Sequence, residues 1–347
     1  MFPTMIASRT WLGLFSVVVL AAVALVAVTH PDLARQFAQN LASLSPAPLA
    51  TAFLLILVQV SAQAMRFWAI IPRDTGTSAL RAAYVFTVGD WTNIFLPARG
   101  GDALKVLLLT RPERGQPAPL TRATGAMLAD KVVDIGTLFI LCTVAGLTSL
   151  LALRTRAALP PPAVVLGAGA LLVLLLVMAW RSGSPWIVTV KAGLWDVLRG
   201  QSALKHPFWC PASVFFSVAS RALEILAMGV LCGAVGYRLS PPQLLLALLT
   251  VNLSTVVPVS FANLGVYETG LTYGLTRAGV PLPAAITVAT THHALELLGI
   301  TLSAAGYALA GRVRLRDPSP GLLDHHRPAA PGQIPVDHAA GDQPQSQ

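Results

Sequence analysis

The chain has 347 residues, of which 54% are hydrophobic and 11% are charged, and its mean hydropathy is +0.66. Ordinary soluble domains carry about 25% charged residues, so this composition does not cover a water-facing surface. We therefore predict an all-α integral membrane protein and exclude a soluble enzyme. The net charge of +9 does not indicate nucleic-acid binding. The cations lie in short loops between apolar segments, and membrane proteins retain Lys and Arg in their cytoplasmic loops.

The sequence predicts six membrane spans, each close to the about 20 apolar residues that cross a bilayer. They cover residues 11–28, 49–71, 126–153, 163–180, 212–237 and 283–311. These spans belong to one predicted transmembrane domain over residues 1–316. The chain after Arg316 is rich in Pro, His, Asp and Gln, so residues 317–347 are predicted to form a disordered tail.

Two further apolar stretches, 79–109 and 244–275, are interrupted by Pro and Gly. Thirteen Lys and Arg residues fall in the loops on the side of the N-terminus, and five fall on the opposite side. This asymmetry predicts that the N- and C-termini are both cytoplasmic. In that orientation each interrupted stretch begins and ends on the same side of the membrane. We therefore expect two re-entrant hairpins made of broken helices.

The two halves of the chain share a pattern of polar residues. Arg66 precedes Arg221 by 155 positions, Pro97 precedes Pro258 by 161, and Asp134 precedes Glu296 by 162. Given the loop charges, residues 49–153 and 212–311 are predicted to form an inverted repeat. Paired broken helices in such repeats indicate a transporter binding site near the bilayer midplane. The alternative is a pair of structural hairpins that only fill space between spans.

Charged residues inside the predicted spans are the main candidates for a site. Glu296 lies near the middle of the last span, where an ionised acid costs roughly 2.5 to 3.5 kcal/mol unless it is paired or hydrated. His292 and His293 can share its side of the helix, and Arg221 and Glu224 form a comparable pair. Three interpretations are open: structural ion pairs between helices, a site for an anionic substrate or a proton, and a metal site at His292, His293 and Glu296.

A second charged group lies at the start of the 126–153 span. Asp130 and Asp134 share a helix face, with Lys131 nearby, and these charges are expected to reach the cytoplasmic interface. Two acids at this spacing would also suit Mg²⁺. Gly270 and Gly274 fit a close contact between helices, and we assign them to packing alone.

Three motifs in order resemble the lysylphosphatidylglycerol synthase transmembrane-region family, whose members are flippase-like. Residues 96–105 (LPARGGDALK) resemble its L-P-x-R-x-G-E-x-x-R segment, and Asp130-Lys131-x-x-Asp134 resembles its E-R-x-x-D motif. Residues 258–268 (PVSFANLGVYE) are similar to its P-x-S-x-x-G-x-G-x-x-E hairpin. The chain departs from these motifs mostly by conservative changes, with Asp for Glu and Lys for Arg. Asn263 replaces a Gly, and Tyr267 stands where many members carry a basic residue.

The resemblance implies a stand-alone member without the soluble aminoacyl-transferase domain, which binds an anionic or glycosylated membrane lipid and moves it between leaflets. Arginine and lysine side chains would hold phosphate, and the acids would pair with them or with an amine of the headgroup. No catalytic residue, metal or cofactor is expected. The expected substrate-binding residues are Arg66, Asn93, Pro97, Arg99, Gly101, Asp102, Lys105, Asp130, Lys131, Asp134, Arg221, Glu224, Pro258, Ser260, Asn263, Gly265, Glu268, His292 and Glu296.

Two alternatives to transport remain open. The first is a membrane-embedded transferase that acts on a lipid or polyprenyl phosphate, with Mg²⁺ held by Asp130 and Asp134. The second is a non-catalytic partner of a lipid-modifying enzyme or glycosyltransferase, in which the charged spans only bind another subunit.

Overall fold

The computed structural model describes residues 28–72, 75–96, 100–111, 119–151, 207–255 and 261–311, and every regular element in these ranges is helical. The predicted all-α class is thus confirmed for this part of the chain. Three described helices are long and apolar enough to cross a membrane, at Pro46–Ile70, Trp209–Ala234 and Leu282–Ala310. They match three of the predicted spans. The predicted span 163–180, all of 11–28 except Val28, and the 317–347 tail lie outside the described residues.

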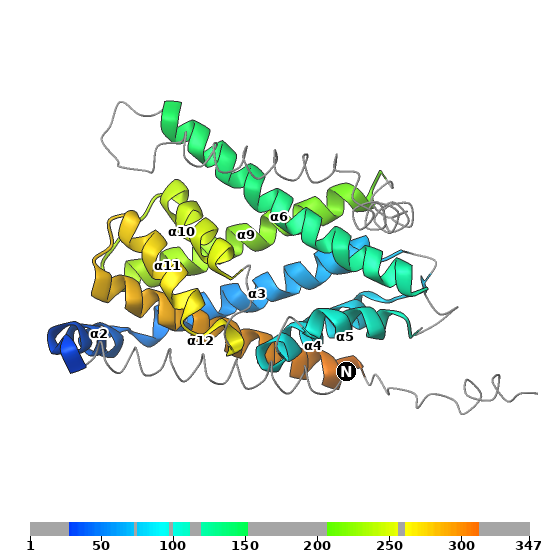
Figure 1. Cartoon of the computed structure of the whole chain (residues 1–347), viewed down its shortest axis with the longest axis horizontal. Coiled ribbons are helices and arrows are strands. Elements are labelled where there is room, and N and C mark those ends of the chain that lie inside the picture. Colours follow the sequence, from blue (N-terminus) through cyan, green and yellow to red (C-terminus); the bar gives the residue numbers. More distant parts are fainter. Residues whose placement is uncertain are drawn as a thin grey trace, which may run out of the picture. The chain divides into compact units, whose positions relative to one another are not determined.

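Each half of the described chain has two short helices between two long ones (Figure 1). The first half contains α3 (Pro46–Ile70), α4 (Ala79–Phe95), α5 (Gly100–Leu109) and α6 (Leu120–Leu151). The second contains α9 (Trp209–Ala234), α10 (Pro241–Ser254), α11 (Val266–Arg277) and α12 (Leu282–Gly311). The four inner helices have 10 to 17 residues. At 1.5 Å per residue each is shorter than the roughly 30 Å hydrocarbon core. The reversed direction of the two halves and the total of six spans stay predictions.

The break between α10 and α11 is made by residues in left-handed backbone conformations. A short 3₁₀ turn, Phe261–Asn263, contains Ala262 at φ 52° and Asn263 at φ 55°, and Gly265 follows at φ 81°. Asn and Gly adopt this region at little cost, whereas Ala adopts it rarely. The Gly265 amide then donates to Glu268 Oε2 at 2.7 Å, which caps the start of α11.

Gly270 and Gly274 allow α11 to lie directly against α10. A Cβ atom at Gly270 would meet the Ser254 side chain, and one at Gly274 would meet Thr250 and the backbone of Ala247. Small residues at this spacing let two helix backbones approach closely. The packing role predicted for these glycines is therefore confirmed.

Apolar packing forms two sets of core residues, and α3 contributes to both. Its first half, with Ile56 and Val60, packs with α9, α10, α11 and α12. Its second half, with Phe67 and Ile70, packs with α4, α5 and α6. Helix α3 also lies along α9 (Figure 1). Along the sequence of α3, polar residues such as Gln63 lie between the residues that belong to the first set and those that belong to the second.

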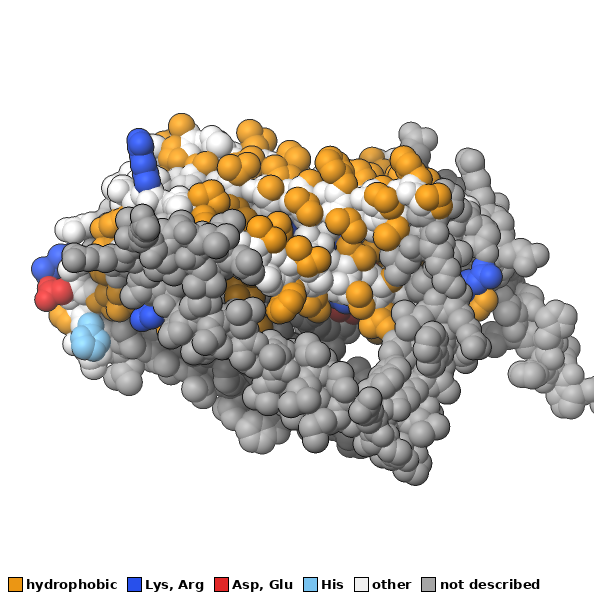
Figure 2. All heavy atoms as spheres, turned by 90° about the horizontal axis from the view of Figure 1, so that it is seen from above, with side chains coloured by type: hydrophobic (Ala, Val, Ile, Leu, Met, Phe, Trp, Pro, Cys, Tyr) orange, Lys and Arg blue, Asp and Glu red, His pale blue; other side chains and the backbone are white. Residues whose placement is uncertain are grey.

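The outer surface of the described helices is largely apolar. Figure 2 shows one face on which hydrophobic side chains predominate among the described residues. Exposed examples include Val132, Ile135 and Phe139 on α6. Such a surface is suited to lipid. A helix that was not predicted, α2 (Pro31–Ser43), has no buried residue and is amphipathic, and it packs near α12.

Candidate functional site

A chain of buried ion pairs connects α3, α6 and α9. The Arg66 Nε atom donates to Asp130 Oδ1 at 2.8 Å and Nη2 donates to Asp130 Oδ2 at 3.3 Å. Arg66 Nη1 also donates to Asp134 Oδ1 at 2.5 Å. The two acids therefore share one face of α6, as their spacing predicted. Asp130 is fully buried within the protein, against the arginine of a neighbouring helix, and the expected approach of these acids to the cytoplasmic interface stays a prediction.

Arg221 extends this chain of ion pairs into the second half of the protein. Its Nη2 atom donates to the same Asp134 oxygen at 2.7 Å, and its Nη1 atom donates to Glu224 Oε2 at 2.8 Å. The pair predicted between Arg221 and Glu224 is thus present. Asp134 joins the two arginines that sequence analysis had placed at equivalent positions of the halves. Buried charges persist only when they are compensated in this way.

A cavity of about 230 Å³ opens beside this chain of ion pairs. Its wall combines charged and amide side chains with apolar residues, and it is formed by α3, α6, α9, α10, α11, α12 and the break before α11. The lining residues are Gln59, Gln63, Asp134, Arg221, Glu224, Val251, Asn252, Thr255, Ala262, Asn263, Tyr267, His293, Glu296, Leu297 and Ile300. Five of the predicted site residues therefore lie together around one cavity: Asp134, Arg221, Glu224, Asn263 and Glu296.

The helices α11 and α12 meet beside the cavity through aromatic and histidine side chains. The Tyr267 hydroxyl lies 2.8 Å from His292 Nδ1, and the Tyr267 ring stacks on His293 at 4.2 Å between centroids. His293 Nδ1 in turn lies 2.7 Å from Glu268 Oε1. His292 is consequently buried behind the cavity wall, while His293 and Glu296 face the cavity. Within the described ranges no three His, Cys, Asp or Glu side chains are grouped to hold a metal ion.

A second charged cluster lies between α4 and α5. Lys105 is fully buried, with its Nζ atom 2.6 Å from Asp90 Oδ1 and 3.3 Å from Asp102 Oδ1. Asn93 donates to Asp102 at 3.2 Å and accepts from the Gly101 amide at 2.8 Å. These contacts join α4 to α5.

Two further contacts belong to this cluster. The ammonium of Lys105 also lies 4.5 Å from the centre of the Phe86 ring. Lys131 Nζ of α6 is 3.9 Å from Asp102 Oδ2. The predicted phosphate-binding group Lys105 thus contacts two carboxylates of the protein itself. It does not line the 230 Å³ cavity.

The remaining predicted residues divide into two groups. Pro97, Arg99, Pro258 and Ser260 lie outside the described residues. Gly265 and Glu268 form the start of α11, as described above, and Gly101 allows close contact between α4 and α5, since a Cβ atom there would meet the Gly89 carbonyl.

Several residues of the site were not predicted, and three of them carry polar side chains at positions where the sequence does give a signal. Gln59 and Gln63 line the cavity from α3, and Asp90 is the closest carboxylate to Lys105. Two amides four positions apart in an otherwise apolar span are a signal that the sequence does carry, because they share one helix face. Asp90 precedes Asn93 by one helical turn, which is a similar signal.

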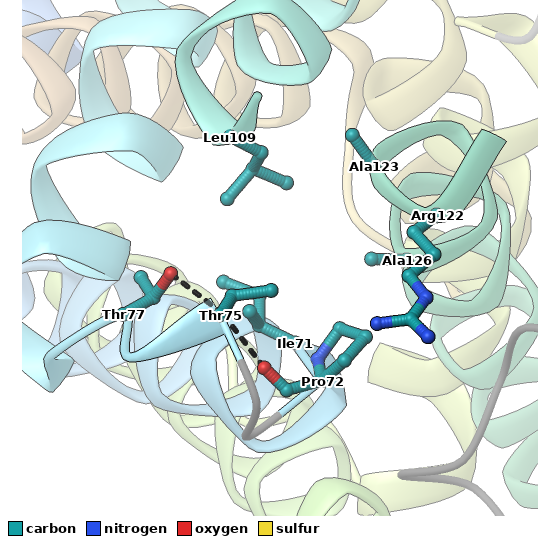
Figure 3. Close-up of a pocket in the computed structure, with 8 residues that line it drawn as sticks. All are labelled: Ile71, Pro72, Thr75, Thr77, Leu109, Arg122, Ala123 and Ala126. Carbon is teal, nitrogen blue, oxygen red and sulfur yellow. Dashed lines mark hydrogen bonds between the residues drawn. The ribbon is translucent and has the colours of Figure 1, made fainter. Parts of the chain in front are cut away.

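A smaller hollow lies at the end of α3, between α5 and α6 (Figure 3). Its volume is about 10 Å³, room for about one water molecule, so it is too small for a headgroup. The Thr75 hydroxyl donates to the Pro72 carbonyl at 2.7 Å and lies 2.9 Å from the Thr77 hydroxyl. This hollow is best explained as part of the turn that follows α3.

Apolar helices around a buried, charged cavity define a multi-pass membrane protein. A family model for the lysylphosphatidylglycerol synthase TM region matches residues 12–304. The chain belongs to this family, which confirms the resemblance found in its motifs and indicates a lipid-related function in the membrane. No curated protein and no solved structure matches the chain.

Proposed function

We propose that this protein is a flippase-like transporter that moves a membrane lipid, anionic or glycosylated, between the two leaflets. The observation that carries the proposal is the cavity bordered by Asp134, Arg221 and Glu296, enclosed by helices that are apolar on the outside. A lipid headgroup that crosses the hydrocarbon core needs a polar path, because polar groups without partners are costly there. The membrane is expected to be a bacterial-type inner membrane, with both termini in the cytoplasm.

The cavity contains contributions from both halves of the chain. Asp134 comes from α6 of the first half, and Arg221 and Glu296 come from α9 and α12 of the second. In inverted-repeat transporters, the substrate binds where two repeats meet and one repeat rocks against the other. We propose the same alternating access here, with Asp134 and Arg221 at the centre.

The transferase alternative is less well supported by the geometry. It places Mg²⁺ between Asp130 and Asp134, but Arg66 of α3 contacts both of these carboxylates. A cation of the protein therefore already balances their charge. The partner alternative would leave the cavity without a role. It would be favoured by stable co-purification of an enzyme together with normal function of Glu296→Gln and Arg221→Ala variants.

Sealed vesicles that contain the purified protein test the proposal. Fluorescent lipids with anionic and with glycosyl headgroups would be quenched from outside, and quenching beyond the outer-leaflet share measures translocation. We expect translocation of at least one lipid with the natural sequence, loss in Glu296→Gln, and no change in Asp32→Asn, an acid-to-amide change on the exposed α2. Equal translocation by protein and by protein-free vesicles for every headgroup would contradict transport, and a chelator-sensitive change in lipid mass would favour the transferase.

A further inference from the structure

Two buried polar atoms at the cavity have no hydrogen-bond partner within the described part of the chain. They are Gln59 Oε1, on a residue that is 3% exposed, and Arg221 Nε, on a residue that is 4% exposed. Both residues line the cavity. Buried polar groups in folded proteins are nearly always paired, so each such atom indicates a missing partner.

The two side chains lie beside charged groups of the same cavity wall. Gln59 shares this wall with the Glu296 carboxyl, and its Oε1 atom has no donor among the residues that the structure describes. The two terminal nitrogens of Arg221 each donate to a carboxylate, of Asp134 and Glu224, whereas the Nε atom has no acceptor in the same part of the chain. Two residues of one cavity wall therefore carry one acceptor and one donor that have no partner among the described side chains.

The chemistry of these two atoms discriminates between classes of headgroup. A phosphodiester can accept from Arg221 Nε–H but has no proton to donate to Gln59 Oε1. An ammonium group can donate to Gln59 Oε1 but cannot accept from Arg221. A hydroxyl group both donates and accepts. Hydroxyl groups alone can therefore satisfy both atoms, whereas a phospholipid headgroup would need its phosphate for Arg221 and an ammonium or hydroxyl group for Gln59.

The charges of the cavity wall also favour a headgroup with several hydroxyls and no phosphate. Among the described lining residues, Asp134, Glu224 and Glu296 are acids, whereas Arg221 is the only Lys or Arg. A phosphate inside this cavity would face three carboxyl groups and would compete with Asp134 for Arg221. The amides of Gln63, Asn252 and Asn263 complete the polar wall, and they donate and accept like hydroxyls.

We propose that the cavity binds the uncharged glycosyl headgroup of a glycolipid. Gln59 Oε1 accepts from one sugar hydroxyl, and Arg221 Nε–H donates to another hydroxyl or to the ring oxygen. The volume of about 230 Å³ is below the roughly 300–1,000 Å³ of sites for drug-sized ligands, and it suits one sugar ring. The apolar side chains of Leu297 and Ile300 at the same cavity suit the start of the lipid chains. This inference rests on the proposed function, because it takes the cavity as the lipid site.

Native mass spectrometry of the purified full chain tests the inference. The probes are monoglucosyl diacylglycerol, phosphatidylglycerol and phosphatidylethanolamine with identical acyl chains, titrated in a polyoxyethylene detergent. Glucoside and maltoside detergents are avoided because they carry the chemistry under test. We expect the glucolipid to bind at least about tenfold more tightly than either phospholipid, and Gln59→Leu to weaken its binding about three- to tenfold, the size expected for one hydrogen bond.

Two further variants make the result specific to the cavity. Gln59→Met also lacks the amide but keeps a longer, unbranched side chain, so it should weaken glucolipid binding by a similar factor. Gln36→Leu makes the same change as Gln59→Leu on an exposed position of α2 and should leave binding unchanged. Glucolipid binding that is unaffected in both folded Gln59 variants would overturn the proposal. Tighter binding of either phospholipid would also overturn it.

The vesicle assay described above separates this inference from the transport function. Selective, Gln59-dependent glucolipid binding without translocation would keep the headgroup assignment and contradict transport. Glu296-dependent translocation of phosphatidylglycerol, with no glucolipid binding, would keep transport and contradict the headgroup assignment.

Discussion

The Asp134 carboxylate accepts a hydrogen bond from Arg221 at 2.7 Å, although 87 positions separate the two residues in the sequence. The same oxygen accepts from Arg66 at 2.5 Å. One carboxylate on α6 therefore compensates two buried guanidinium groups, on α3 and α9. Its removal affects both, and this makes Asp134 the most informative single position in the protein.

Asp134→Asn should destabilise the protein by about 3–5 kcal/mol, because it leaves two buried arginines with less negative charge around them. Thermal unfolding in detergent, followed by tryptophan fluorescence, measures the change. Asp32→Asn is the matched control, since Asp32 pairs with Arg35 at 3.7 Å on the exposed surface of α2. Its effect should stay below about 1 kcal/mol. Equal effects of the two changes would show that the Asp134 ion pairs contribute little.

Lys105→Met should destabilise by about 3–5 kcal/mol, because it removes the buried cation that contacts both Asp90 and Asp102. In the double variant with Asp90→Asn, the loss of unfolding free energy should be smaller than the sum of the losses in the two single variants. The coupling free energy should be about 1 kcal/mol or more. Denaturant unfolding in mixed micelles gives the four values of this cycle. The corresponding cycle of Arg35→Met with Asp32→Asn should give a coupling near zero, and additive effects at Lys105 and Asp90 would refute the prediction.

Gly274→Ala should destabilise by about 1–3 kcal/mol, because the added methyl group meets Thr250 and the backbone of Ala247 on α10. Gly136→Ala provides the control within α6, where no atom lies within 4 Å of the added Cβ. There the change should be neutral or should stabilise by about 0.5–1 kcal/mol, as Gly costs conformational entropy in a helix. The unfolding temperatures of the two variants measure these effects. A decrease for Gly136→Ala as large as that for Gly274→Ala would count against close packing of α10 and α11.

Tyr267→Phe should destabilise by about 1–3 kcal/mol, because it removes the hydroxyl that pairs with the buried His292 Nδ1 atom. The matched change Tyr273→Phe, on the same helix α11 at a side chain that is 59% exposed, should stay within about 0.5 kcal/mol. Thermal unfolding of both variants under identical conditions measures the difference. An unchanged unfolding temperature in Tyr267→Phe would mean that His292 finds another partner.

Much of the fold follows from short-range sequence patterns. The interruptions at 79–109 and 244–275 were predicted from Pro and Gly, and the structure has separate short helices there. Arg221 and Glu224 are one helical turn apart, so their pairing could be predicted from spacing alone. Gly270 and Gly274 similarly indicated a close helix contact before any partner helix was known.

Contacts between distant segments could not be predicted in the same way. The burial of Asp130 was not predicted, because it depends on Arg66, which lies 64 positions earlier in the sequence and reaches it from α3. The pairing of Gln59 with Gln63 on one helix face indicated a polar stripe on α3, but two neutral amides do not by themselves indicate what that stripe contacts. Its importance depends on the cavity, and the cavity exists only once six helices and the break before α11 have been brought together.

The position of Asp134 between two arginines also has a consequence for communication across the site. A ligand that pulls Arg221 toward itself loosens that arginine's bond to Asp134, and Asp134 then remains with Arg66 alone. The electrostatic environment of α3 and α6 would thus differ between the empty and the occupied cavity, even if the ligand touches neither Arg66 nor Asp130. Such a shared carboxylate would couple the two halves of the chain electrostatically, in addition to the packing of α3 against α9.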